Sequence, residues 1–440
     1  MKAKALIFFQ VYDTKLQYDE LFPYSEIENI YQIVEAGAFN KEDNKITLSI
    51  RLNFITKKLH ALLHNCMLMQ RRYSTLMYLN RVRGYFPNRF EFKTIKFRNF
   101  KKRSFIDRLV IVSFSNLAGI IFLKLILRFF FRLENFSQTK KLLDFSLFIL
   151  PYTGGISAEW DFLVWYSRRN RIESVAIQEN WDNLSSKQFL LEHPLRFYVW
   201  GKQSGSHLRT FQNFTGEIVE VGCLRVQDFY NVRNEYIEGN LIRSNSNYIL
   251  YVDSNVERGD HYFLTLLSNF LAATSNINLK DTFILYRTHP KAMNDLNRSN
   301  YLDELKSIPL VQIHQPNLYE TNKERLEQVV EAKAVISIFS TMLLESLIAF
   351  KKCIVPNFNI GFENYSQKSI IDDLTHFHGI SMLSNIEAVT NPTELFDQLN
   401  ELDIINIDTT CESKIFDWFC KNTNTKTKIV ENLNKIYNNL

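Results

Sequence analysis

The residues with the clearest chemical potential lie at a turn around Ser340 and Thr341, in the second half of the chain. An apolar run over 334–339 precedes this turn, and a helical pattern over 342–350 follows it. A helix start presents free backbone N–H groups and the positive end of the helix dipole, which together favour an anion. We therefore predict that this strand-to-helix turn binds a phosphate group.

A second cluster of polar residues, Arg287, His289 and Lys291, follows a predicted strand over 282–286. Arginine and lysine suit phosphate oxygens, and histidine can donate a hydrogen bond or transfer a proton. This cluster and the Ser-Thr turn both follow strands in the same half of the chain. We predict that they contact the same phosphate group.

Two more side chains, Glu345 and Ser337, lie close in sequence to this predicted phosphate site. Glu345 follows Thr341 by four residues, so both lie on one face of the predicted helix. A carboxylate there can accept hydrogen bonds from ribose hydroxyls, and the alternative is a glutamate on the helix surface. Ser337 lies within the apolar run. Its hydroxyl either contacts the phosphate-bearing ligand or forms its hydrogen bonds within the core.

The first half of the chain carries carboxylates that could deprotonate an acceptor hydroxyl. The candidates are Glu159, Glu179 and Asp182, and their spacing does not choose among them. The segment over 179–187 is dense in polar residues and contains Trp181. It is either a sugar-facing loop with the tryptophan as a stacking surface, or a turn with ordinary capping residues.

Predicted strands alternate with predicted helices along the chain, which indicates βαβ units and parallel sheets. We predict a first domain over 1–232, a linker over 233–247, a second domain over 248–405 and terminal helices over 406–440. Ligands of open α/β sheets bind at the carboxyl ends of the strands, and each polar segment above follows such a strand. The predicted fold class is thus α/β, with two parallel-sheet domains facing across a cleft.

Some local predictions depend on weaker patterns. A helix is predicted over 24–37 and a longer one over 53–82, each ending near a glycine. An exposed strand is predicted over 90–97, where apolar and charged residues alternate, and another strand over 380–383.

Basic residues are concentrated over 89–134, although the whole chain carries a net charge of only +5. Lys124, Arg128 and Arg132 recur every four residues, so they lie on one side of a helix that is otherwise rich in Phe and Leu. Such a helix can lie on an anionic bilayer surface, and the alternative is a core helix with one charged stripe. The most apolar window, 109–123, is too short to span a membrane, and we predict no transmembrane helix.

The cysteines and the N-terminus indicate the compartment. Five cysteines without a CxxC pair argue against a disulfide framework and against a zinc site, and they favour buried thiols in a reducing cytoplasm. The N-terminal apolar run lacks the length and the cleavage site of a signal peptide, so we predict a buried first strand over 3–11.

Four segments together resemble a known family. They are WDNLSSK at 181–187, VWGKQSGSHLR at 199–209, LYRTHPK at 285–291 and ISIFSTMLLESLIAFKKCIVP at 336–356. These segments resemble bacterial surface-polysaccharide glycosyltransferases of the GT-B fold, which act in capsule or O-antigen synthesis. The His-Pro and Ser-Thr motifs are also similar to those of the polysialyltransferase, Kdo-transferase and CDP-glycerol glycerophosphotransferase groups.

The resemblance implies roles for individual residues. In those groups the His-Pro and Ser/Thr residues hold the nucleotide phosphates of the donor, which implies this role for His289, Ser340 and Thr341. It also implies two Rossmann-like domains and inverting transfer without a bound metal, and the chain has no Asp-x-Asp motif between apolar strands. No separate cofactor is expected, because the nucleotide-activated sugar donor is a substrate.

The expected function is transfer of a sugar from a nucleotide-activated donor to a surface-polysaccharide or lipid-linked glycan acceptor. The enzyme would lie in the cytoplasm, peripherally on the inner face of the membrane, without nucleic acid as a partner. Asp182 or a neighbouring carboxylate would deprotonate the acceptor, and His289 with the Ser-Thr turn would stabilise the leaving phosphate. The alternatives are a CDP-polyol phosphotransferase, a nucleotide-sugar epimerase and a non-enzymatic binding protein that depends on residues 89–134.

Overall fold

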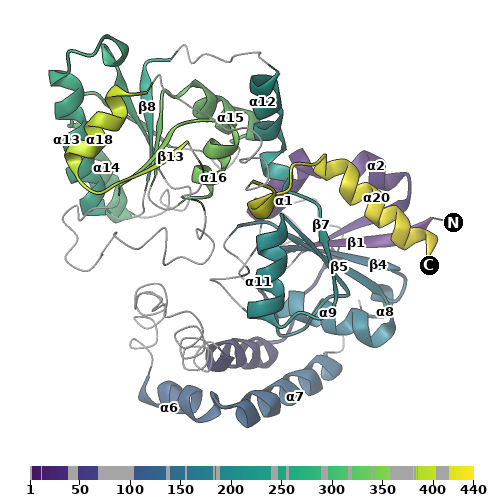
Figure 1. The fold of residues 1–440 in the computed structure, drawn as a ribbon. Helices are drawn as coiled ribbons and strands as arrows, with labels where there is room; N and C mark the ends of the chain where they lie inside the picture. The colour runs from purple at the N-terminus through teal and green to yellow at the C-terminus, as the bar shows by residue number, and fades with distance from the viewer. Residues whose placement is uncertain are drawn as a thin grey trace. The chain divides into compact units, whose positions relative to one another are not determined.

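The computed structural model contains two units of parallel α/β structure (Figure 1). Unit 1 comprises Met1–Leu224 and Trp418–Leu440, and unit 2 comprises Arg225–Asp417. The structure describes residues 2–10, 12–37, 48–67, 104–134, 139–153, 156–181, 184, 189–238, 246–253, 257–288, 296–315, 320–337, 340–356, 380, 383, 385–402 and 416–440.

Unit 1 is built on a seven-stranded parallel sheet with the strand order β3-β2-β1-β4-β5-β6-β7. Its strands are β1 (Ala3–Phe9), β2 (Tyr31–Gly37), β3 (Leu48–Ser49), β4 (Leu147–Tyr152), β5 (Glu173–Gln178), β6 (Arg196–Val199) and β7 (Glu217–Glu220). Its described helices are α1 (Tyr12–Leu21), α2 (Tyr24–Glu28), one over 54–67, α6 (Phe105–Phe114), α7 (Leu117–Leu133), α8 (Thr139–Leu142), α9 (Ala158–Asn170), α11 (Lys202–Gln212) and α20 (Thr425–Asn438).

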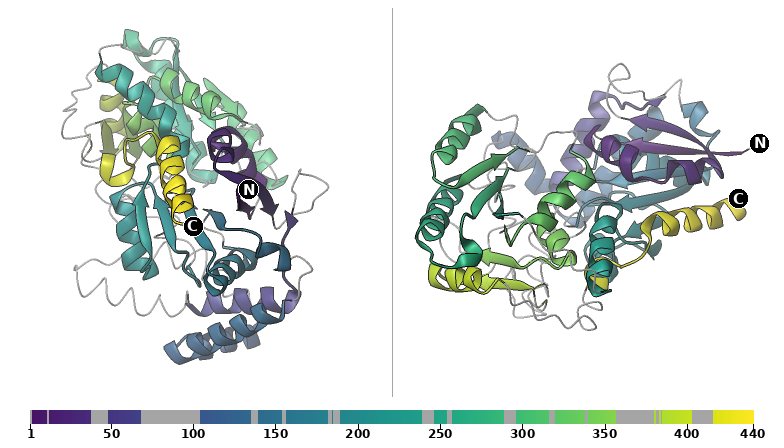
Figure 2. Two further views of the ribbon diagram at one scale, coloured as in Figure 1. Left: turned by 90° about the vertical axis from the view of Figure 1, so that its right-hand side faces the viewer. Right: turned by 90° about the horizontal axis from the view of Figure 1, so that it is seen from above.

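Helices cover both faces of this sheet (Figures 1 and 2). The central strand β4 is buried at every position, as expected for a continuous apolar run in a parallel sheet. One face packs against α7, α9, α11 and the helix over 54–67, and the other packs against α1, α2 and α20. The Tyr31 hydroxyl donates a hydrogen bond to the Leu433 carbonyl at 3.1 Å, which links the C-terminal helix α20 to strand β2 of this sheet.

Unit 2 is built on a six-stranded parallel sheet with the strand order β10-β9-β8-β11-β12-β13. Its strands are β8 (Tyr248–Val252), β9 (Phe283–Arg287), β10 (Val311–His314), β11 (Val335–Ser337), β12 (Cys353–Pro356) and β13 (Ile386–Val389). Its described helices are α12 (Gln227–Ile237), α13 (Glu257–Ala273), α14 (Leu296–Lys306), α15 (Asn322–Glu331), α16 (Thr341–Ile348) and α18 (Pro392–Asn400), and the 3-10 turns are Leu224–Val226, at the boundary between the units, and Ile277–Leu279.

Local sequence signals account for several of these elements. The strand β8 is buried at all five positions, and Leu264, Leu302 and Leu395 from three helices pack on one face of its sheet. A reciprocal capping box between Thr321 and Glu324 begins α15. The prediction of two parallel-sheet α/β domains is confirmed, and the predicted cleft between them stays a prediction.

The single helix predicted over 24–37 is wrong. A short helix ends at Glu28, and Tyr31–Gly37 forms β2, which pairs in parallel with β1. Ile33 and Val34 are β-branched residues that favour a strand, and Gly37 ends that strand rather than a helix. The strand predicted over 380–383 is also misplaced, because β13 lies at Ile386–Val389.

The described structure divides the chain at other points than the predicted domain bounds. The predicted linker over 233–247 overlaps α12, which continues to Ile237. The segment from Trp418, within the terminal helices predicted over 406–440, groups with unit 1. The helix predicted over 53–82 is described over 54–67, and the strand predicted over 90–97 lies outside the described residues. Cys66, Cys223, Cys353 and Cys420 are buried, as the sequence predicted.

Candidate functional site

Two of the predicted donor residues of unit 2, Arg287 and Ser337, lie at the carboxyl edge of its sheet. The register pairs Val252 of β8 with Arg287 of β9 and with Ser337 of β11, so the three residues form one row across the sheet. Strand order reverses between β8 and β11, which is the switch point where open α/β sheets bind their ligands. Topology therefore brings Arg287 and Ser337, which are distant in sequence, to the same edge.

Helix α16 begins at this edge with Ser340 as its N-cap residue. The Ser340 hydroxyl accepts a hydrogen bond from the Met342 backbone N–H at 3.1 Å, and Thr341 is the first helical residue. Both side chains are half-buried. The helix start thus lies at the carboxyl side of β11, as the sequence predicted, and its dipole favours an anion there.

Two buried hydroxyls lie at the same edge of the sheet. Ser337 and Thr288 are 1% and 2% exposed, respectively. Ser337 Oγ and Thr288 Oγ1 have no hydrogen-bond partner among the described residues. Buried polar atoms are nearly always satisfied, so these hydroxyls are candidates for contacts to a bound ligand.

Arg287 is held in a network of side chains within unit 2. It forms a two-pronged ion pair with Glu320 and donates a hydrogen bond to Gln328 Oε1 at 2.6 Å. Burial alone raises the pKa of Glu320, but hydrogen bonds from Arg287 and His314 outweigh burial and lower this pKa to about 2. Arg287 is only 4% exposed, so these contacts favour a supporting role, and direct phosphate contact stays a prediction.

Glu345 is buried beneath two arginines. Its carboxylate forms ion pairs with Arg225 Nε at 3.0 Å and with Arg325 Nε at 3.3 Å, and it is 1% exposed. The alternative of a surface glutamate is therefore wrong. A ribose contact stays a prediction, and it requires the sugar to share a carboxylate that already holds two guanidinium groups.

In unit 1, Glu179 directly follows β5 and is half-buried at the carboxyl edge of the sheet. Its Oε1 accepts a hydrogen bond from the buried Tyr18 hydroxyl at 2.5 Å. Burial and the Glu179 charge raise the pKa of Tyr18 well above its ordinary value, so Tyr18 stays protonated and donates this bond. Among the described candidates for the base, Glu179 is the one that directly follows a strand at the carboxyl edge of the sheet.

Gln10 was not predicted as a site residue. It follows β1 directly, and it bridges β1 and β4 at the switch point of the first sheet. Its side chain donates to the Pro151 carbonyl at 3.3 Å and accepts from the Ser157 backbone N–H at 2.6 Å. A polar residue directly after the first apolar run was the available signal.

Two predicted residues of unit 1 have structural contacts. Glu159 is 3% exposed and pairs with Lys57 Nζ at 2.7 Å, which disfavours it as a base. Trp181 is 2% exposed, donates a hydrogen bond to Gln203 and packs edge-on against Phe419. The reading of Trp181 as an open stacking surface for a sugar is therefore wrong, because its ring is covered within unit 1.

Three predicted site residues lie outside the described residues. They are the candidate base Asp182 and the donor contacts His289 and Lys291. Arg287 and Thr288, which immediately precede His289, are described at the carboxyl edge of the second sheet. The roles of the three residues stay predictions.

Comparison with known proteins gives a likeness of fold. No protein-family model matches the chain, and no curated protein sequence matches it. The structure of S. aureus MnaA with UDP aligns at 9% identity with a TM-score of 0.50, covering 100% of this chain and 98% of its own. A Neisseria meningitidis UDP-GlcNAc 2-epimerase bound to UDP-GlcNAc aligns at 12% identity with a TM-score of 0.50, covering 98% of this chain and 100% of its own.

The chain has a GT-B-like fold. The two sheets share the same order around their switch points, with the first strand of each beside the fourth. In this GT-B-like fold, the residues predicted for the donor side lie in unit 2, and the described carboxylate candidates lie in unit 1.

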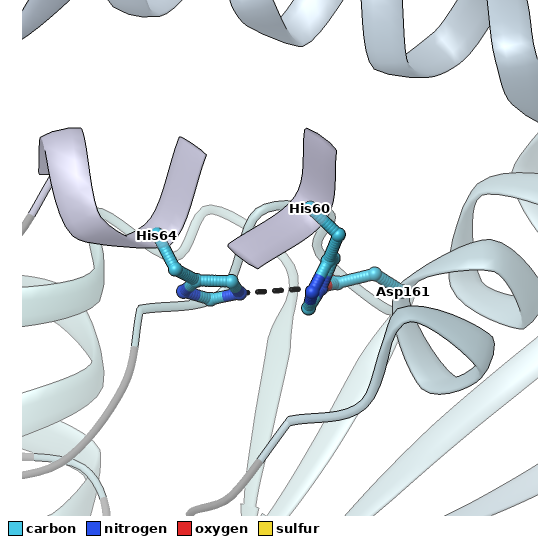
Figure 3. A group of neighbouring side chains, drawn as sticks. All are labelled: His60, His64 and Asp161. Atoms are coloured by element: carbon cyan, nitrogen blue, oxygen red, sulfur yellow. Dashed lines mark hydrogen bonds and ion pairs between the residues drawn. The ribbon is translucent and has the colours of Figure 1, made fainter. Parts of the chain in front are cut away.

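A cluster of possible metal ligands lies inside unit 1, close in sequence to Glu159. His60 and His64 come from the helix over 54–67, and Asp161 comes from the first turn of α9 (Figure 3). Their ligand atoms lie within 4.8 Å of one another, and all three residues are buried. The sequence predicted no metal site, because its ligands come from helices that are far apart in the chain.

Proposed function

We propose that this chain is a glycosyltransferase that moves a sugar from a nucleotide-activated donor to a surface-polysaccharide or lipid-linked glycan acceptor. The observation that carries the proposal is the convergence of Ser337, the Ser340-capped start of α16 and the end of β9 at one switch point. Open α/β sheets bind nucleotides at this position, and helix starts bind phosphate.

The proposed chemistry assigns one task to each unit. His289, Ser340 and Thr341 bind the donor phosphates, and the dipole of α16 stabilises the charge that develops on the leaving phosphate. Glu179 or Asp182 accepts the proton of the acceptor hydroxyl. We propose inverting transfer, in which one base and one leaving-group site are sufficient and no metal takes part at the donor.

A nucleotide-sugar epimerase is the second candidate, because a UDP-GlcNAc 2-epimerase bound to UDP-GlcNAc shares the fold. An epimerase turns over its nucleotide sugar without an acceptor, whereas a transferase requires one. A CDP-polyol phosphotransferase, the alternative suggested by the sequence motifs, releases CMP.

Identification of the nucleotide product tests these functions. The protein is incubated with UDP-sugars, GDP-sugars, CMP-sugars or CDP-glycerol, with and without a lipid-linked glycan fraction from bacterial membranes. The proposal expects acceptor-dependent release of the nucleotide from a sugar donor. Epimerised donor without an acceptor supports the second candidate, and CMP released from CDP-glycerol supports the phosphotransferase. No turnover under any condition contradicts all three.

We also propose that unit 1 lies on the inner face of the cell membrane through an apolar surface on α6 and α7. No single helix among the described residues is long and apolar enough to cross a membrane. The two helices meet that test only as a pair, and they are bent by 103° relative to each other. The α6–α7 surface consists of exposed side chains, at least 52% accessible: Phe105, Ile106, Leu109, Val112, Leu117, Ile121, Phe122, Leu125, Phe129 and Leu133.

The basic residues of α7 contribute less to this surface than the sequence suggested. Lys124 donates to the Leu191 carbonyl, and Arg128 forms a two-pronged ion pair with Glu192. Arg132 is exposed. The opposite face of α7 is buried, and its Phe131 packs against α9. Two consecutive helices with large outward apolar side chains fit a bilayer interface, where burial of apolar area is the main driving force.

Replacing Phe122 and Phe129 together by glutamate is expected to weaken vesicle binding by roughly 100-fold or more. Burying each phenylalanine contributes about 1.5 kcal/mol or more, and a factor of ten corresponds to about 1.4 kcal/mol. The measurement is co-sedimentation of the full chain with vesicles that contain anionic lipid. Ile277→Glu, at a residue of unit 2 that is 80% exposed, is the matched control and should bind like the wild type. Equal binding of all three proteins, or no binding by the wild type, contradicts this proposal.

A further inference from the structure

The geometry points to a divalent transition-metal site in unit 1, suited to Zn²⁺, formed by His60, His64 and Asp161. The histidines are four residues apart, so they project from the same face of the helix over 54–67. Asp161 approaches them from the first turn of α9 (Figure 3). A histidine pair at this spacing is a common way for a helix to present two nitrogen ligands to zinc.

The distances from Asp161 Oδ2 to the two histidines can be compared with the ligand spacing around one ion. Zinc lies about 2.1 Å from histidine nitrogens and carboxylate oxygens, so two ligands in tetrahedral geometry are about 3.4 Å apart. His64 Nε2 is 3.5 Å from Asp161 Oδ2, which matches that spacing. His60 Nε2 is 2.8 Å from the same oxygen, so this pair must separate by about 0.6 Å to admit an ion.

Ligand chemistry and burial select the class of ion. Asp161 has a fully buried carboxylate, and the side chains of His60 and His64 are 7% and 6% exposed, respectively. Ca²⁺ and Mg²⁺ prefer oxygen ligands throughout, whereas two imidazoles and one carboxylate are a set used by zinc.

A backbone contact orients the carboxylate for this role. The Glu192 backbone N–H donates to Asp161 Oδ1 at 3.2 Å, while Oδ2 faces both histidines. Supporting hydrogen bonds of this kind fix the direction of a ligand in metal sites. The nearby ion pair between Lys57 and Glu159 joins the same two helices, so the cluster is one of several polar contacts between them.

The ion would fasten the helix over 54–67 to the start of α9. Ser157, the N-cap residue of α9, accepts a hydrogen bond from the Trp160 backbone N–H through its side chain, and its own N–H is bonded to Gln10 at the switch point of the first sheet. The site therefore supports the edge of unit 1 that carries the acceptor-side candidates. Its burial excludes a large substrate, so the metal would support the structure rather than take part in the reaction. This inference does not depend on the proposed function.

Metal titration of the full chain tests the site without an activity assay. The protein is stripped with a chelator and then titrated with Co²⁺, whose visible absorption reports coordination number. The expected result is one cobalt ion per chain with a four-coordinate spectrum, in which water is the fourth ligand beside the three side chains. Zn²⁺ should displace the cobalt and raise the unfolding midpoint. A wild-type chain that binds neither ion contradicts the inference, and this result does not depend on any variant.

Variants assign the ion to this cluster. Asp161→Asn keeps the side-chain volume, and His64→Ala removes one nitrogen ligand, and each should weaken Co²⁺ binding by more than about 100-fold. His261→Ala removes an exposed histidine of unit 2 and should bind cobalt like the wild type. Far-UV circular dichroism confirms that each variant is folded. Binding that persists unchanged in folded Asp161→Asn and His64→Ala proteins overturns the assignment.

Discussion

The His289→Ala variant is expected to lower the rate of sugar transfer by about 10²- to 10³-fold while the protein stays folded. Removing one well-placed hydrogen-bond donor to a developing negative charge has an effect of this size. In the sequence, His289 immediately follows Arg287 and Thr288, which lie at the carboxyl edge of the second sheet. The measurement is the initial rate of acceptor-dependent nucleotide release at saturating donor.

His261→Ala is the matched control for this prediction. His261 is an exposed histidine on α13 in the same unit, so its loss removes the same chemical group from a solvated position. Its rate should equal that of the wild type. An unchanged rate in the His289→Ala protein would contradict the leaving-group role that we assign to this residue.

Glu345→Ala is expected to destabilise unit 2 by about 3–5 kcal/mol. Removing one partner of a buried ion pair leaves an uncompensated charge, and here Arg225 and Arg325 both lose their shared carboxylate. Urea unfolding followed by far-UV circular dichroism measures the change. All five tryptophans of the chain lie in unit 1, so a tryptophan fluorescence transition reports that unit separately.

Two comparisons separate this structural role from the predicted ribose contact. Glu304→Ala, at an exposed position of α14, should change stability by less than about 0.5 kcal/mol. If Glu345 acts mainly on ribose, the Glu345→Gln protein will lose nucleotide affinity but keep its stability. Unchanged stability in Glu345→Ala contradicts the account of the two arginine contacts.

The sheet core and the strand-to-helix turn at Ser340 could be predicted from sequence because their signals are local. The strand β4 is a run of buried residues, and Ser340 precedes a helix that lacks Gly and Pro. By contrast, Tyr31–Gly37 contains β-branched residues within a pattern that also fits a helix, and only pairing with β1 decides between the two. Local periodicity does not contain that information.

The roles of the charged residues depended on contacts across long sequence separations. Glu345 meets Arg225 and Arg325, and Arg128 meets Glu192, which are partners that no spacing rule identifies. The same limit applied to the histidines over 54–67, whose proximity to Asp161 requires the packing of two helices. Sequence therefore located the chemical groups, whereas the fold determines which of them are neutralised by a neighbour.

The central claim is that unit 2 binds the phosphates of a nucleotide-activated donor. The most direct test is the thermal unfolding midpoint of the wild type and of His289→Ala with increasing UDP, CDP, CMP or GDP. A ligand that binds only the folded protein stabilises it by about 2.7 kcal/mol at a hundred times its dissociation constant. The account predicts a midpoint that rises with at least one nucleotide in the wild type and stays constant in His289→Ala. A midpoint that does not move with any nucleotide in the wild type would contradict it.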